Sequence, residues 1–211
     1  MHIQLTFAKT PAMRYTSHLD LMRALERTFR RAELPLAYTQ GYNPHPRINL
    51  ISALPLGFTS ECEIADVQLE ASIPAQEIQP ALQQAAPPGI EILSVQEITG
   101  QQPAMQTLLL ASLFIVTLSD PPADLESRIE ILLASTELTR QRRGKSYNLR
   151  PLIETLYRLE DNAEGYARLH MRLAARQGTT GRPEEVLEAL GIAAHNARIH
   201  KIQMVFIEQQ E

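Results

Sequence analysis

The sequence predicts an α+β fold made of two similar β-α-β-β-α-β halves. Segments that alternate polar and apolar residues are interspersed with segments whose apolar residues recur every three or four positions. The same order of segments occurs twice, and a polar linker, 99–103, separates the two passes. This is the element order of ferredoxin-like domains, so we expect two ferredoxin-like halves, 1–100 and 104–211, packed together. A single larger α+β domain with one mixed sheet is the alternative.

The first half contains four predicted strands and two predicted helices. Ser17 is a typical N-cap for a helix over 18–32, in which Leu21, Leu25 and Phe29 recur at four-residue spacing and form one buried stripe. A second helix over 74–85 is stopped by the Pro-Pro-Gly at 87–89. The strands are predicted at 2–7, 47–52, 61–69 and 90–98.

The second half repeats this order without residue-level identity to the first. A helix follows Asp120-Pro121-Pro122, and another lies between Pro183 and Gly191. The segment 166–174 alternates clearly, with Tyr166, Arg168, His170 and Arg172 opposite its apolar residues. The strands are predicted at 112–118, 148–159, 166–174 and 199–207.

The composition is that of an ordinary globular protein. Of the 211 residues 44% are hydrophobic and 21% charged, and the formal net charge is −4. Any contact with nucleic acid must therefore come from a local basic patch. The N-terminus lacks the pattern of a signal peptide, and no apolar run is long enough to span a bilayer. We therefore expect a cytoplasmic protein that makes no membrane contact.

Tyr42-Asn43-Pro44-His45-Pro46-Arg47 is the most unusual stretch of the chain. Prolines on both sides of His45 restrict its backbone, and a rigid loop holds a histidine and an arginine in a fixed geometry. A second cluster, Arg14 to Asp20, lies at the start of the first helix, where free N–H groups suit a phosphate or carboxylate. The structural alternatives are a stiffened turn for the first cluster and a capping box formed by Ser17 and Asp20 for the second.

We expect the two clusters to converge on one anion-binding or nucleotide-binding site. Two of their residues, His18 and His45, are the candidates for acid–base catalysis. The candidate substrate-binding residues are Arg14, Ser17, His18, Asp20, Tyr42, Asn43, His45 and Arg47.

The segment 140–150 is strongly basic. It holds five cations and an aromatic residue but no acid, a composition that suits a phosphate backbone and a stacked base. The candidate nucleic-acid-binding residues are Arg140, Arg142, Arg143, Lys145, Tyr147 and Arg150. The alternative is a solvated loop or hairpin whose charge aids solubility.

Other chemistry has little support in the sequence. There is no phosphate-binding loop, no dinucleotide-binding fingerprint and no zinc-protease or serine-hydrolase motif. His18 and Asp20, two apart on a helix, point in different directions, and Cys62 is the single cysteine. We therefore predict no metal site and no cofactor.

Both unusual clusters resemble the radical SAM-linked domain family of bacteria. The matching residues are Arg14 to Arg23, Leu34-Pro35, Gly41 to Ile48 and Ala53 to Gly57, with weaker matches at 148–152 and 182–187. In that family the domain is fused to a radical SAM protein or encoded beside one, and its activity is not established. The resemblance implies a radical SAM protein as partner. The chain cannot itself be the radical enzyme, because one cysteine cannot form the Cys-x-x-x-Cys-x-x-Cys cluster motif.

The expected function is that of an accessory binding module beside a radical SAM protein. It would bind RNA or another phosphorylated substrate through the region of His18, His45 and Arg47. One alternative is a protein-interaction scaffold for the radical SAM partner. Another is a metal-independent ribonuclease or phosphoryl-transfer enzyme that uses the two histidines. The lack of a recognisable catalytic motif favours binding over catalysis.

Overall fold

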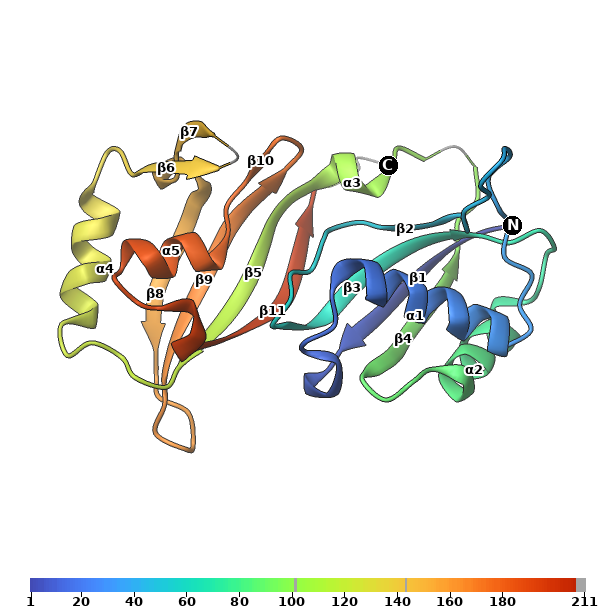
Figure 1. The fold of residues 1–211 in the computed structure, drawn as a ribbon, viewed down its shortest axis with the longest axis horizontal. Helices are drawn as coiled ribbons and strands as arrows, with labels where there is room; N and C mark the ends of the chain where they lie inside the picture. The colour runs from blue at the N-terminus through green and yellow to red at the C-terminus, as the bar shows by residue number, and fades with distance from the viewer. Residues whose placement is uncertain (101, 143, 208–211) are drawn as a thin grey trace. The chain divides into compact units, whose positions relative to one another are not determined.

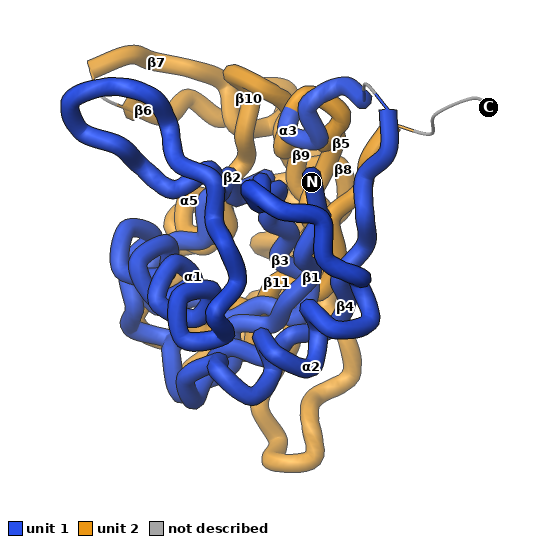
Figure 2. Tube along the Cα trace, turned by 90° about the vertical axis from the view of Figure 1, so that its right-hand side faces the viewer, with its two compact units in different colours: residues 1–106 blue, residues 107–211 orange. Residues whose placement is uncertain are grey.

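The computed structural model describes residues 1–100, 102–142 and 144–207. The chain divides into two compact units, Met1–Gln106 and Thr107–Glu211, which Figure 2 shows in different colours. Each unit combines a sheet of antiparallel strands with helices, and the described residues contain five α-helices in all. The short helix α3 (Met105–Leu108) lies at the boundary between the two units.

Unit 1 is built on a four-stranded antiparallel sheet in the order β4-β1-β3-β2. In Figure 1, α1 and α2 cover one face of this sheet. The elements follow the chain as β1 (His2–Lys9), a 3-10 turn (Pro11–Met13), α1 (His18–Arg31), β2 (Ile48–Leu50), β3 (Phe58–Gln68), α2 (Ala75–Ala85) and β4 (Ile90–Glu97).

Alternation along β1 and the helical spacing in α1 produce the core of unit 1. Ile3, Leu5 and Phe7 of β1 are fully buried against one stripe of α1, which consists of Leu21, Leu25 and Phe29. Burial of each such side chain stabilises the fold by roughly 1.5–3 kcal/mol. The side chains between them on β1 point to the other face of the sheet, because side chains alternate along a strand.

Unit 2 has four principal antiparallel strands in the order β11-β5-β9-β8. A short strand, β10, extends the β9 edge, and β6 and β7 form a separate hairpin. The elements are β5 (Leu109–Leu118), α4 (Leu125–Ala134), β6 (Thr139–Arg142), β7 (Lys145–Asn148), a 3-10 turn (Arg150–Leu152), β8 (Ile153–Leu159), β9 (Ala167–Arg176), β10 (Thr179–Thr180), α5 (Pro183–Ala189), a second 3-10 turn (Ala194–Asn196) and β11 (Ala197–Phe206).

Two strands are much shorter than the sequence predicts. The predicted strand at 47–52 is only three residues long. The predicted strand at 148–159 begins at Ile153, because residues 150–152 form a 3-10 turn that contains Pro151, which has no N–H to donate to a strand ladder. The basic segment before this turn forms the β6–β7 hairpin.

None of the helices in the described part of the chain is both long and apolar enough to cross a membrane.

Candidate functional site

The face of the unit 1 sheet opposite α1 and α2 is polar. In β1 and β3, Leu5 pairs with Ala65 and both side chains point to the core. The neighbouring pair, Gln4 and Asp66, therefore points to the other face. Asn49 of β2 pairs with Asp66 and extends the polar surface across a third strand.

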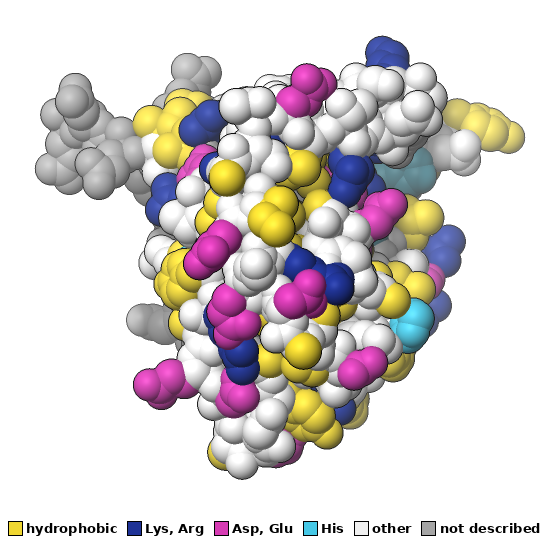
Figure 3. Space-filling view, turned by 90° about the vertical axis from the view of Figure 1, so that its left-hand side faces the viewer, with side chains coloured by type: hydrophobic (Ala, Val, Ile, Leu, Met, Phe, Trp, Pro, Cys, Tyr) yellow, Lys and Arg dark blue, Asp and Glu magenta, His cyan; other side chains and the backbone are white. Residues whose placement is uncertain are grey.

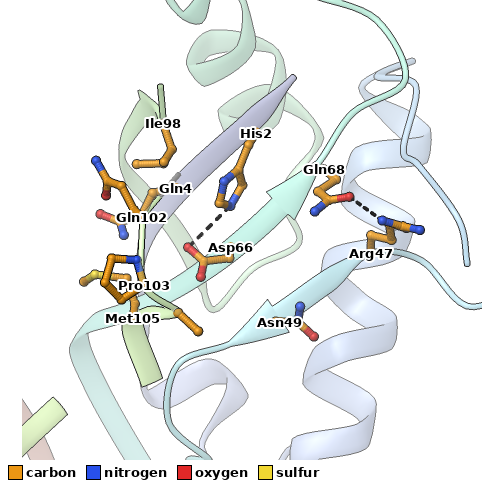
Figure 4. A pocket seen from close by; sticks show the side chains of 11 residues that line it. His2, Gln4, Arg47, Asn49, Asp66, Gln68, Ile98, Gln102, Pro103 and Met105 are labelled. Atoms are coloured by element: carbon orange, nitrogen blue, oxygen red, sulfur yellow. Dashed lines mark hydrogen bonds and ion pairs between the residues drawn. The ribbon is translucent and has the colours of Figure 1, made fainter. Parts of the chain in front are cut away.

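A cavity of about 220 Å³ lies on this face (Figure 4). The three strands supply one wall, and the segment that follows β4 supplies the other. Gln106 anchors that segment, because its Nε2 donates a hydrogen bond of 3.2 Å to the carbonyl of Leu50. The lining residues are His2, Gln4, Arg47, Asn49, Asp66, Gln68, Ile98, Gln102, Pro103, Ala104 and Met105.

The polar groups of the cavity fall into two parts, which Figure 4 shows. In one, Nε2 of His2 lies 3.9 Å from Oδ1 of Asp66. Burial raises the pKa of this carboxyl group, whose side chain is 17% exposed, while the nearby imidazole opposes the shift. In the other, Nη1 of Arg47 donates a 2.8 Å hydrogen bond to Oε1 of Gln68. The cavity therefore offers a guanidinium at one side and an imidazole–carboxylate pair at the other.

The Gly41–Arg47 motif positions the arginine. The N–H of Arg47 donates to Ala37 (2.8 Å), and the N–H of Thr39 donates to His45 (2.9 Å), so the segment folds back on itself. Gly41 has φ +134°, a conformation that favours glycine. Of the predicted residues in this motif, Arg47 lines the cavity, whereas Tyr42, Asn43 and His45 are exposed.

In the other predicted cluster, 14–20, side chains form hydrogen bonds that stabilise the loop and the start of α1. Ser17 caps α1: its Oγ accepts a 3.2 Å hydrogen bond from the N–H of Asp20 and donates one of 2.7 Å to that carboxylate. Nε of Arg14 donates to the carbonyl of Gly57 (2.9 Å). Beneath this loop, the buried Lys9 donates to the carbonyl of Thr16 (2.9 Å). The Ser17–Asp20 pair considered from the sequence therefore caps α1 through the Ser17 hydroxyl.

The structure does not bring the two clusters together, so the single convergent site expected from the sequence is not formed. His18 begins α1, next to the loop that the last residue of β1, Lys9, contacts. Arg47 contacts Gln68, which pairs with His2, the first residue of β1. Seven residues of extended strand separate these ends by about 23 Å. The reason is α1 itself, which spans about 21 Å and carries the chain from one end of the sheet to the other.

In the basic segment, much of the predicted nucleic-acid set is engaged within the protein. Arg142 forms an ion pair of 2.6 Å with Glu185, and its guanidinium lies 4.9 Å from the centre of the Tyr147 ring. Burial, together with a hydrogen bond to Glu185, raises the pKa of Tyr147 to about 12. Arg142 and Tyr147 therefore stabilise the β6–β7 hairpin against α5.

Arg150 has a similar structural role. Its Nε donates to the carbonyl of Leu133 (3.1 Å) in the last turn of α4, and its Nη1 donates to Ile153 (3.0 Å). A cation there also complements the helix dipole. Arg140 donates to the adjacent Thr139 carbonyl (3.0 Å), and Lys145 is exposed. Arg143 lies outside the described residues.

The remaining polar residues of the cavity were not among the predicted site residues. His2, Gln4, Asp66 and Gln68 are outward-facing positions of alternating strands, which are polar in most half-exposed sheets. The alternation of 2–7 was visible in the sequence, whereas that of 61–69 is interrupted at Ala65-Asp66, and nothing indicated that Gln4 lies opposite Asp66. Among the described residues there is no group of three or more histidine, cysteine, aspartate or glutamate side chains that could hold a metal ion.

Comparison with protein families gives a match over residues 2–183 to the family described as "Uncharacterized protein conserved in bacteria (DUF2344)". The chain belongs to this family. The DUF2344 match includes the strands that line the cavity and the whole β6–β7 hairpin. Its description states neither a reaction nor a partner. Comparison with curated proteins gave no match.

Proposed function

We propose that this DUF2344 protein is an accessory binding module that binds a phosphorylated ligand, an RNA or a free nucleotide, in the unit 1 cavity. The observation that carries the proposal is the position of Arg47. A proline-flanked loop places this arginine at a cavity whose other polar lining groups are amides, an imidazole and a carboxylate.

The distribution of charge supports one orientation of the ligand. A guanidinium has five N–H donors in a planar fork, and the bond to Gln68 uses one nitrogen, so donors remain for a phosphate. The carboxylate of Asp66 would repel a phosphate that bound beside it. The phosphate is therefore expected at Arg47, and the hydrogen-bonding part of the ligand, a base or ribose, at His2, Gln4 and Asp66.

The alternatives differ in their support. The enzyme alternative used His18 and His45 as an acid–base pair, and their positions at opposite ends of β1 count against it. A protein-interaction scaffold is favoured by one specific observation: the side chain of Tyr42, at the tip of its loop, is 100% exposed. The radical SAM protein as partner, and the cytoplasm as location, belong to the proposal through the family resemblance and the sequence pattern.

We also infer that both units are ferredoxin-like. In unit 1 the fourth strand lies beside the first, then the third and the second, which is the order β4-β1-β3-β2. In unit 2 the order β11-β5-β9-β8 is equivalent when the β6–β7 hairpin and the short β10 are treated as insertions.

The experiment is equilibrium binding of fluorescein-labelled single-stranded RNA and of a labelled adenosine nucleotide to the purified chain. Arg47→Ala is compared with Arg31→Ala, which removes an exposed arginine at the end of α1, outside the cavity. We expect Arg47→Ala to weaken binding about tenfold or more, because a charged hydrogen bond is lost.

The control Arg31→Ala should change the affinity less than about twofold. Binding should also weaken between about 50 mM and about 200 mM salt, as phosphate contacts require. Equal effects of the two substitutions, or no binding of either ligand at low salt, would overturn the proposal. Retention of nucleotide binding without RNA binding would identify the small ligand as the source of the phosphate.

A further inference from the structure

The open face of the unit 2 sheet combines stacked rings with arginine side chains. In β9 and β5, Leu169 pairs with Val116 and both are buried on the core side. The neighbouring pairs, His170 with Ile115 and Arg168 with Thr117, therefore point away from the core. The alternation of 166–174 seen in the sequence thus places the histidine and arginines of β9 on one surface.

Cross-strand pairing extends this surface over four strands. Beside His170 lie Tyr157 of β8 on one edge and, beyond Ile115, His200 of β11 on the other. The next row contains Arg168 and, beyond Thr117, Arg198 of β11. With neighbouring strands about 4.8 Å apart, the two arginines are separated by about 10 Å.

Tyr157 and His170 stack on one another, and the exposed tyrosine of this stack is the aromatic platform. Their ring centres are 4.6 Å apart and their planes are inclined by 20°. The tyrosine is 47% exposed, so part of the stack is open to solvent. Burial, with a smaller contribution from Arg172, lowers the pKa of His170 from its ordinary value, which favours the neutral imidazole. A neutral ring stacks on tyrosine without the cost of a partly buried charge.

The arginines around this platform leave positive charge on the surface. Arg168 donates through Nε to the carbonyl of Glu160 (2.9 Å), and this bond does not use its two terminal nitrogens. Arg198 is exposed. Glu154 accepts a 2.7 Å hydrogen bond from Arg172 and also lies 3.5 Å from Arg176, so one carboxylate serves two guanidinium groups. By contrast, acidic and basic side chains are intermixed on the face of unit 2 seen in Figure 3.

We propose that this open sheet face of unit 2 binds single-stranded nucleic acid. A base stacks on Tyr157, and phosphates contact Arg168 and Arg198. Single-stranded chains expose base faces that a duplex conceals, and base–aromatic stacking beside a basic surface is the usual means of holding them. The surface shares no residue with the unit 1 cavity.

The test is fluorescence anisotropy with the full chain and three probes of equal length: an oligouridine, an oligothymidine and a duplex. Tyr157→Ala removes the platform, and Tyr157→Phe retains the ring. We expect Tyr157→Ala to weaken single-strand binding about tenfold and Tyr157→Phe to change it less than about twofold. Arg168→Ala should weaken binding and lower the slope of log affinity against log salt by about 1.

Arg182→Ala, which removes an exposed arginine at the start of α5, is the matched charge control and should leave the affinity unchanged. Arg198→Ala tests the surface without altering the core if Tyr157→Ala does not fold. Preference for RNA over DNA would indicate contacts to the 2′-hydroxyl, and equal affinity would indicate stacking and phosphate contacts alone. Either outcome supports the proposal.

Wild-type affinity in both the folded Tyr157→Ala variant and Arg198→Ala would overturn the proposal that this surface binds single strands. Tighter binding of the duplex would also overturn it. A labelled nucleotide separates this surface from the unit 1 cavity. Its binding should weaken in Arg47→Ala and not in Tyr157→Ala, so failure of one proposal leaves the other open to test.

Discussion

Tyr157 and His170 are direct partners on adjacent antiparallel strands, and their rings stack with centres 4.6 Å apart. Cross-strand aromatic pairs of this kind contribute about 0.5–1.5 kcal/mol beyond the area that they bury. The pair therefore stabilises the β8–β9 edge of unit 2 as well as forming the proposed platform. Experiments at this position must measure folding and binding separately.

Acidification should destabilise the protein through His170. The pKa of this histidine is lowered from 6.5 by burial, so on acidification the unfolded chain takes up the proton before the folded one. Its contribution to stability is complete above about pH 6.5 and is lost as pH falls through the folded-state pKa. Urea unfolding at a series of pH values should show that the free energy of unfolding falls less steeply on acidification in His170→Phe than in wild type.

The corresponding control is His45→Phe, at an exposed loop position. Its pH dependence should match that of the wild type. If the stability of His170→Phe also fell as steeply with pH as that of wild type, the acid sensitivity would arise from other groups.

Removal of Glu185 should destabilise unit 2. This carboxylate accepts hydrogen bonds of 2.6 and 2.8 Å from Nη2 of Arg142, and both side chains are largely shielded from solvent. We expect Glu185→Ala to lower the free energy of unfolding by about 1.5–3 kcal/mol, because it leaves a half-buried guanidinium without its anion. Urea denaturation measures this change.

A neighbouring acid on the same helix is the control. Glu188→Ala, at an exposed position of α5, should change the free energy of unfolding by less than about 0.5 kcal/mol. The double variant Arg142→Ala/Glu185→Ala should lose less than the sum of the single variants, because each removes the same interaction. Additive losses would mean that the pair is not coupled.

Ser17→Ala should weaken folding without affecting ligand binding. The Ser17 hydroxyl accepts the hydrogen bond from the N–H of Asp20 at the start of α1. Loss of such a cap lowers stability by about 1 kcal/mol. The variant should therefore melt at a lower temperature and bind the labelled nucleotide with wild-type affinity. Weaker binding with unchanged stability would mean that Ser17 contacts the ligand, as the sequence suggested.

Gly89→Ala should destabilise unit 1 more than a glycine substitution at an open turn. A Cβ at this position would lie 2.6 Å from Cγ and 2.8 Å from the backbone nitrogen of Met13, and φ is +99°. Gly165 has φ +80° with open space around it, so Gly165→Ala carries only the backbone strain of about 1–2 kcal/mol. Thermal unfolding should therefore show a larger decrease in melting temperature for Gly89→Ala. Equal decreases would show that the turn at Met13 moves aside.

Local patterns predicted most of the elements, because each is stabilised by residues close together in the chain. The spacing of Leu21, Leu25 and Phe29 placed α1 within a residue of its observed end, and Ser17 marked its start. For the basic segment a hairpin was only the alternative interpretation, and its two strands were not predicted. Polar strands lack an apolar alternation, and Tyr147 packs against an arginine instead of the core.

The candidate site was predicted only in part, because its residues come from separate strands. Arg47 was singled out by the prolines around its loop and does line the cavity. Asp66 and Gln4 join it only through strand register, since a shift of one residue would turn both side chains to the opposite face. The same limit applies to Arg142, whose partner Glu185 is 43 residues away.

The sequence by itself determined most of the helices and strands, where α1 is capped, and which loop is rigid enough to orient an arginine. These properties depend on backbone preferences and on the periodicity of apolar residues. Only the tertiary structure decided that His18 and Arg47 lie at opposite ends of β1 and that Tyr157 meets His170. The physical reason is that antiparallel pairing and the length of α1 set distances between residues remote in the chain, and no local preference encodes those distances.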